Sequence, residues 1–159
     1  MNNDLIPKVQ PSLLDIRMDS KTFPRLCRYD HDEAVRQMAL IVSKAMMYRG
    51  QTADSVGITL IASSLVDELL QENRWGARYL SLEEIEIVVK RAVLEGDIYI
   101  SVASLYKAVI EYCKGEGHRV QQEAAELKRR QESESIRNSV VAPMLQSYTG
   151  KFIKNSKIR

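Results

Sequence analysis

Few residues in this 159-residue sequence have the type and spacing that catalysis requires. The two histidines, His31 and His118, form no metal-spaced pair, and the sequence contains no CxxC, HExxH or nucleophile-elbow motif. The stretch TGKF resembles the end of a phosphate-binding loop. However, it lacks the glycine five positions before Gly150, and Phe152 stands where that loop binds magnesium through Ser or Thr. These observations predict a protein that is not an enzyme and uses no metal or cofactor.

An acidic cluster begins one predicted helix in the stretch SLEE. Ser81 is the expected N-cap, and Glu84 stands three residues later, as in a capping box. Glu83, Glu84 and Glu86 all fall in the first turns, where the helix dipole favours negative charge. Glu86 also precedes Lys90 by four residues, the favourable order for a surface ion pair. We therefore interpret the cluster as a helix start rather than an acid/base pair.

The single tryptophan, Trp75, lies between two arginines, Arg74 and Arg78. One interpretation is a loop aromatic that closes the end of a helical bundle. The other is a binding anchor or base-stacking platform, because Trp and Arg are enriched where binding energy is concentrated. The sequence leaves both open.

The composition is that of a globular protein, with 45% hydrophobic and 28% charged residues. No apolar run approaches the ~20 residues of a membrane-spanning helix. The N-terminus lacks the cationic patch and apolar stretch of a secretory signal, so we expect a cytoplasmic protein that does not bind membranes. Two cysteines are too few for a disulfide framework, and Cys113 has the spacing of a small buried hydrophobic residue.

The charge is distributed unevenly along the chain. From Gly117 onward nine Lys or Arg stand against four Asp or Glu, a net charge of +5, whereas the first 116 residues hold 14 against 17, a net charge of −3. No acidic residue follows Glu134. This basic end is either solubilising surface or a segment attracted to nucleic acid or to an acidic protein.

Apolar residues recur at helical spacing in four stretches, which predicts an all-α fold with a small four-helix core over residues 30–116. The expected helices cover residues 30–50, 59–72, 81–96 and 101–115. Asp30 followed by Glu33 resembles a capping box at the start of the first. The short apolar stretch at 97–102 would have no strand to pair with, so we predict no sheet.

Two segments flank this core. Residues 1–29 contain Pro7, Pro11 and Pro24, so we expect an extended arm with at most one short helical turn, which packs on the core or on a partner. Residues 117–139 are rich in helix formers but have almost no apolar stripe, which predicts a charged helical connector.

Apolar residues return in the last segment, residues 140–159. Val141, Leu145, Tyr148 and Phe152 are separated by four, three and four residues, so one short amphipathic helix presents them together, with Pro143 in its first turn. We expect these four residues to contact a larger partner, with Lys151 and Lys154 steering the approach. The alternative is that the segment folds back and completes the core of its own molecule.

The stretch from Ala92 to Lys114 resembles a helix-turn-helix. Gly96 follows Ala92 by four residues, Val102 by ten and Leu105 three later, and SVASLYKAV is similar to recognition helices of some bacterial regulators. This resemblance implies a DNA-binding regulator as the alternative function. Its expected nucleic-acid contacts are Ser101, Ser104, Lys107, Lys114, Arg74, Trp75 and Arg78. The five-residue turn, 96–100, and the few cations on the exposed face favour a bend in the core instead.

The layout of the whole chain resembles the phage replicative helicase loader/inhibitor family. The corresponding parts are four helices in residues 30–115, a charged connector at 117–139 and a short apolar segment at 140–152. The arm of 29 residues departs from that pattern. The resemblance implies an accessory factor of DNA replication in a phage or mobile element, whose C-terminal segment engages a hexameric helicase. This is our leading hypothesis.

Overall fold

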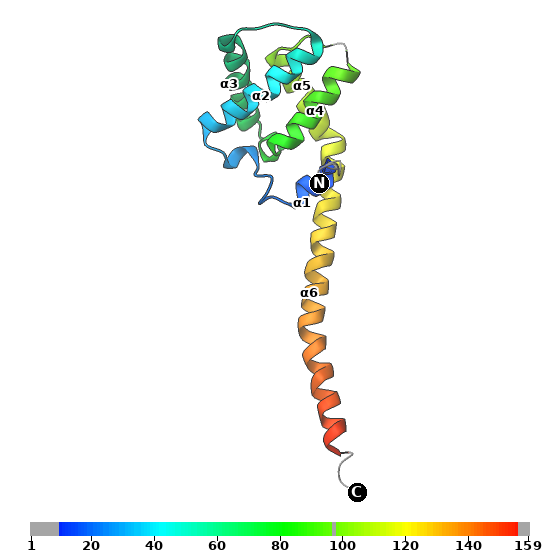
Figure 1. Ribbon diagram of the computed structural model, residues 1–159. Coiled ribbons are helices and arrows are strands. Elements are labelled where there is room, and N and C mark those ends of the chain that lie inside the picture. The colour runs from blue at the N-terminus through cyan, green and yellow to red at the C-terminus, as the bar shows by residue number, and fades with distance from the viewer. Residues whose placement is uncertain (1–9, 97, 156–159) are drawn as a thin grey trace, which may run out of the picture. The chain divides into compact units, whose positions relative to one another are not determined.

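The protein is all-α, as predicted (Figure 1). The computed structural model describes residues 10–96 and 98–155, without the side chains of residues 142 and 146–155. Its α-helices are α1 (Leu13–Met18), α2 (His31–Arg49), α3 (Ser55–Gln71), α4 (Leu82–Glu95), α5 (Val102–Lys114) and α6 (Glu116–Asn155), with short 3-10 helices η1 (Leu26–Arg28) and η2 (Ala77–Tyr79). The described residues contain no strand, only an isolated bridge between Arg25 and Ser81. The chain divides into two compact units, Met1–Gln121 and Gln122–Arg159.

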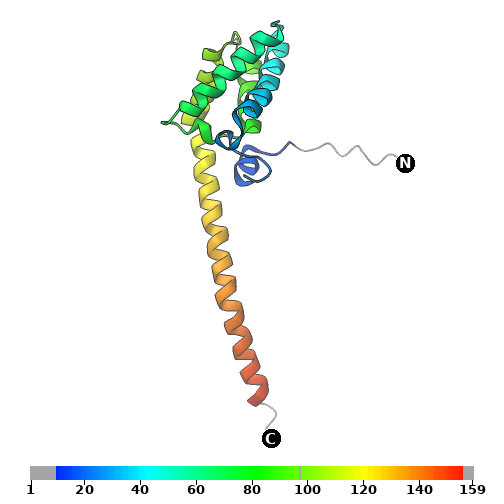
Figure 2. The same cartoon turned by 90° about the vertical axis from the view of Figure 1, so that its left-hand side faces the viewer.

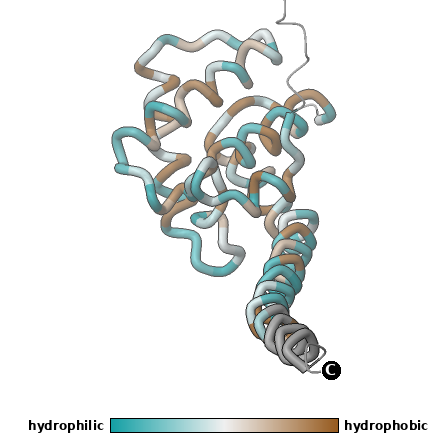
Figure 3. Tube along the Cα trace, turned by 60° about the horizontal axis from the view of Figure 1, so that its bottom comes forward, coloured by the Kyte–Doolittle hydropathy of each residue, from teal (hydrophilic) through white to brown (hydrophobic). Residues whose placement is uncertain are grey.

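The first unit holds the hydrophobic core. Helices α2 and α3 lie side by side, and α4 and α5 pack with them (Figures 1 and 2). Each contributes the apolar stripe that its sequence shows, so that brown hydrophobic stretches recur along the helices in Figure 3. The most deeply buried core side chains include Met38, Val42, Leu65, Leu69, Ile85, Val89, Leu105 and Val109. Cys113 is also buried, as expected, and burial raises the pKa of its thiol to about 12.

Helix starts agree only in part with the predicted ones. Ser101 caps α5, its Oγ accepting from the N–H of Ser104 at 3.2 Å. Helix α3 starts at Ser55, four residues earlier than predicted, because the Asp54 side chain accepts from the N–H of Gly57 at 2.7 Å. Asp30 is the N-cap residue of α2 but makes no side-chain capping bond, so the capping box expected there was wrong.

The described part of the proline-rich segment packs into the first unit. Ser12 and Asp15 form a capping box that starts α1. Leu13, Ile16 and Leu26 are buried, and the Leu26 N–H donates to the Leu80 carbonyl at 2.7 Å. Of the two expectations for this arm, packing on the core is the one seen over residues 10–29. The remainder of the arm lies outside the described residues.

A buried polar network joins α1 to α4 and α5. Arg17 is 7% exposed and Glu84 1% exposed, and the guanidinium donates to both carboxylate oxygens, with Nε at 3.2 Å from Oε2. The Tyr112 hydroxyl donates to Glu84 Oε1 at 2.5 Å. Ser81 caps the N–H of Glu84 as predicted, but the Glu84 carboxylate turns inward instead of completing the capping box. Burial and then the Glu84 carboxylate raise the pKa of Tyr112 far above its usual range.

Helix α6 is one continuous helix of 40 residues (Figure 1). It covers the predicted connector and most of the predicted tail, so these two segments share one helix. Pro143 lies inside the helix rather than in the first turn of a separate one, which corrects that expectation. Strong helix formers precede it, and a proline φ is itself compatible with a helix. In the described part of the chain, no helix combines the length and apolar character of a membrane span.

Candidate interaction surfaces

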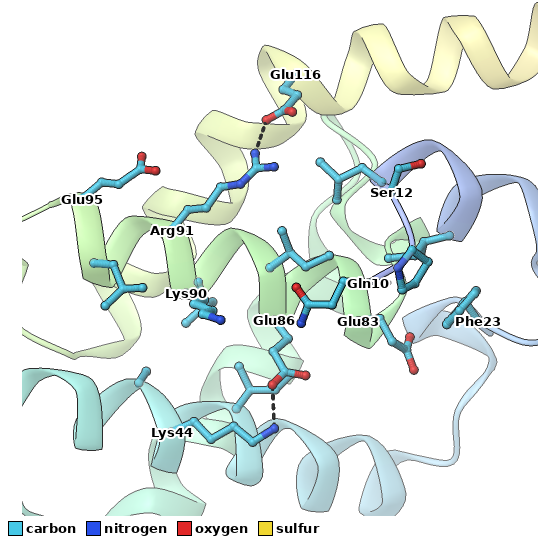
Figure 4. A pocket seen from close by; sticks show the side chains of 18 of the residues that line it. Gln10, Ser12, Phe23, Lys44, Glu83, Glu86, Lys90, Arg91, Glu95 and Glu116 are labelled. Atoms are coloured by element: carbon cyan, nitrogen blue, oxygen red, sulfur yellow. Dashed lines mark hydrogen bonds and ion pairs between the residues drawn. The ribbon is translucent and has the colours of Figure 1, made fainter. Parts of the chain in front are cut away.

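A groove of about 1030 Å³ runs along α4 in the first unit, between α2 and the segment that contains α1 (Figure 4). We call it the α4 groove. Apolar side chains that line it include Leu13, Leu14, Ile41, Ala45, Ile87 and Leu94. Charged side chains that line it are Lys44, Glu83, Glu86, Lys90, Arg91, Glu95 and Glu116. Apolar and charged side chains thus share the lining, a combination found in surfaces that receive a helix or peptide.

Two ion pairs join side chains that line the groove (Figure 4). Lys44 Nζ of α2 lies 2.6 Å from Glu86 Oε1 of α4, and Arg91 Nη1 lies 2.7 Å from Glu116 Oε2. The hydrogen bond to Glu86 raises the pKa of Lys44. The sequence had suggested an ion pair between Glu86 and Lys90. In the structure Glu86 of α4 pairs instead with Lys44 of α2. Because the residues that line the groove come from four separate segments, no local pattern in the sequence indicated it.

Trp75 lies in a cluster of cations. The Arg74 guanidinium carbon is 4.9 Å from the indole centroid, and Lys114 Nζ, from the end of α5, is 5.0 Å from it. The indole is 40% exposed, so it neither fills the core nor stands free of the protein. Arg78 stacks on Tyr79 at 5.6 Å instead. The structure therefore brings Arg74, Trp75 and Lys114 together, three of the residues expected to contact nucleic acid.

The remaining candidates for nucleic-acid binding lie elsewhere. Ser101 and Ser104 both serve the cap of α5, where the Ser104 hydroxyl also donates to the Tyr99 carbonyl at 2.6 Å. Lys107 is exposed, with Nζ at 3.8 Å from Glu111 Oε1. Since α5 has 13 residues, its two ends are about 20 Å apart. The seven candidates therefore span about 20 Å or more, with the cations around Trp75 at one end of α5 and the cap at the other.

Glu72 shapes the loop that carries Trp75. Its carboxylate, on a residue only 7% exposed, accepts from the N–H groups of Arg74 at 2.6 Å, Trp75 at 2.7 Å and Ala77 at 3.1 Å. Gly76 sits between them with φ +75, a conformation that side chains disfavour. Burial acts to raise the pKa of Glu72, but the backbone N–H bonds outweigh it and hold that pKa below its usual value.

We expect Glu72→Gln to destabilise the chain by about 1–3 kcal/mol at neutral pH, because buried N–H groups lose a charged acceptor. The pKa of Glu72 is lower in the folded chain than in the unfolded chain, where it is near 4.5. The stability that the ionised carboxylate contributes is therefore complete above the unfolded pKa and is lost as the pH falls through the folded pKa. The difference in free energy of unfolding between wild type and variant should therefore become smaller on acidification. Urea unfolding between pH 7 and pH 3 measures this difference. A difference that is constant with pH would contradict the role of the Glu72 carboxylate.

The second unit carries an exposed apolar stripe on α6. Its described members are Ile136, Val140, Val141, Met144 and Leu145, which we call the tail stripe; each is at least 42% exposed. Their spacing places them within one half of the helix circumference. Val141 and Leu145 were predicted from the sequence, whereas the other three were not. The predicted side chains of Tyr148, Lys151, Phe152 and Lys154 lie outside the described part.

Comparisons with protein-family models, with curated proteins and with solved structures gave no match to this chain. In the described residues, no group of three or more His, Cys, Asp or Glu is arranged to hold a metal ion. The surfaces themselves must therefore support any functional proposal.

Proposed function

We propose that this chain is a non-catalytic interaction protein whose tail stripe docks into an apolar groove of a larger partner. The observation that carries the proposal is the group of exposed apolar side chains from Ile136 to Leu145, which follows a wholly polar stretch of α6 at residues 128–135. Contiguous exposed apolar surface of this kind marks an interaction site. Anchors at helical spacing fit the mode in which an amphipathic helix lies in a groove.

The basic end of the chain supports the same proposal. Beyond Glu134 the sequence has only basic charged residues, including Arg137, Lys151 and Lys154. Such a charge speeds encounter with an acidic partner surface and adds less to affinity than the apolar anchors do. The resemblance in layout to helicase loaders suggests the partner, a hexameric replicative helicase in a phage or mobile element.

Affinity capture from the native host tests the proposal. We expect a hexameric helicase with the full-length bait and none with a chain that ends at residue 139. The variant with Val141→Asp and Leu145→Asp should lose the same partner in the intact chain. A matched control places aspartates at two exposed polar positions of α6, Ser135→Asp and Ser139→Asp, and should retain it. Equal recovery of the partner by both double variants would contradict the proposal.

The cations around Trp75 favour a second candidate, a DNA-binding regulator. Arg74 and Lys114 flank an exposed indole that is able to stack on a base. Duplex affinity should then fall steeply with salt and weaken in both Lys107→Glu and Lys114→Glu. Fluorescence anisotropy with a labelled duplex measures this, and the absence of binding at low salt would exclude the candidate.

A further inference from the structure

We propose that the α4 groove of one molecule receives the tail stripe of a second copy of this chain, so that the protein self-associates head to tail. The inference rests on the tail stripe of the proposed function and adds a regulation to it. A tail held by another copy is not available to the larger partner, and the two compete. The groove itself has no role in the proposed function.

The dimensions of groove and stripe agree. The groove follows α4 from Glu83 to Glu95, thirteen residues and about 18 Å of helix. The described tail stripe spans Ile136 to Leu145, ten residues and about 14 Å. The groove offers exposed apolar side chains to such a stripe, because Leu94 and Tyr48 line it and are 59% and 50% exposed. Binding would remove apolar area of both the groove and the stripe from water.

The charges of the two surfaces are complementary. The first 116 residues carry a net charge of −3, and the chain from Gly117 onward a net charge of +5. Of the charged residues that line the groove, four are glutamates and three are Lys or Arg. Arg137 lies beside the first member of the tail stripe, and no acidic residue follows Glu134 in the sequence.

The geometry of such an assembly is heterologous, because two different surfaces meet. Two copies that exchange tails close into a dimer, and copies that do not close form longer chains. This differs from pairing of two tail stripes with each other, where the same surface occurs on both sides. An experiment on the chain alone can distinguish these two arrangements, without the larger partner.

The experiment is sedimentation equilibrium of the full-length chain over a range of concentrations. We expect self-association that weakens at least tenfold in a groove variant, Tyr48→Lys with Leu94→Lys, and in a tail variant, Val141→Asp with Leu145→Asp. All four positions are exposed, and thermal unfolding of each variant verifies that it is folded. An equimolar mixture of the two variants should form a one-to-one complex, because it contains one intact groove and one intact tail.

Two outcomes overturn the inference. The first is a full-length chain that stays monomeric at every concentration. The second is a mixture of variants that does not associate, as pairing of tail stripes with each other predicts. Neither outcome affects the proposed function, which the captured partner tests. Conversely, restored association in the mixture, together with no captured helicase, would support the groove while contradicting the proposed function.

Discussion

Replacing Arg17 by methionine is expected to lower the free energy of unfolding by about 3–5 kcal/mol. The variant leaves the Glu84 carboxylate, 1% exposed, without its cation and with the Tyr112 hydroxyl as its remaining side-chain donor. An uncompensated buried charge costs more than the lost hydrogen bonds alone. Chemical denaturation of the full chain at neutral pH measures the change.

The matched control removes both charges at once. In the variant with Arg17→Met and Glu84→Leu no buried charge remains, so most of the lost stability should return. Arg36→Met provides a second control, because Arg36 pairs with Glu33 on the surface, where an ion pair contributes little. A loss of less than about 1 kcal/mol in Arg17→Met would show that the pair does not hold α1 on the core.

Leu105→Ala is expected to destabilise the protein by about 2–5 kcal/mol. The Leu105 side chain is 0% exposed in the core of the first unit, so its truncation loses apolar burial and leaves a cavity. Lys107→Ala, two residues further along α5 and exposed, should change the stability by no more than about 0.5 kcal/mol. Thermal or urea unfolding of both variants compares the two faces of the helix. Similar losses at both positions would contradict the orientation of α5.

That orientation bears on the helix-turn-helix resemblance. Leu105 matched the pattern because it faces the core, whereas Val102 is only half-buried, and inward-facing residues at this spacing occur in any packed pair of helices. The exposed face of α5 instead carries Ala103, Lys107 and Glu111, where the glutamate offsets the lysine. The pattern therefore predicted the packing of α4 and α5 correctly, and it is weak support for DNA binding.

The sequence predicted the features of the fold that depend on neighbours along the chain. The stripes of α2 to α5 repeat every three or four residues, so the period alone indicates each helix and its buried face. The caps at Ser81 and Ser101 join residues three positions apart. The cap at Ser81 was predicted, and for Ser101 only the start of a helix was predicted. The apolar residues Val141 and Leu145, which are exposed in the structure, followed from the same kind of spacing.

The remaining features depend on residues that are distant in sequence. Arg17 and Glu84 are 67 positions apart, and nothing near either residue indicates that they pair. The α4 groove is lined by residues of α1, α2 and α4, among others, which are far apart in the sequence. Its lining is therefore a property of the tertiary structure. Trp75 meets Lys114 for the same reason. A surface of this kind is visible only once the helices have been placed.

The central claim is that the tail stripe binds another molecule and is not part of the core of its own. The most direct measurement is thermal unfolding of the chain that ends at residue 139 beside the full-length chain, both at low concentration. Our account predicts midpoints within about 2 °C of each other, because for a chain of this size a loss of 1 kcal/mol lowers the midpoint by about 2–4 °C. A midpoint that falls by 10 °C or more, roughly 3 kcal/mol on the same scale, would show that residues 140–159 complete the core and would contradict the account.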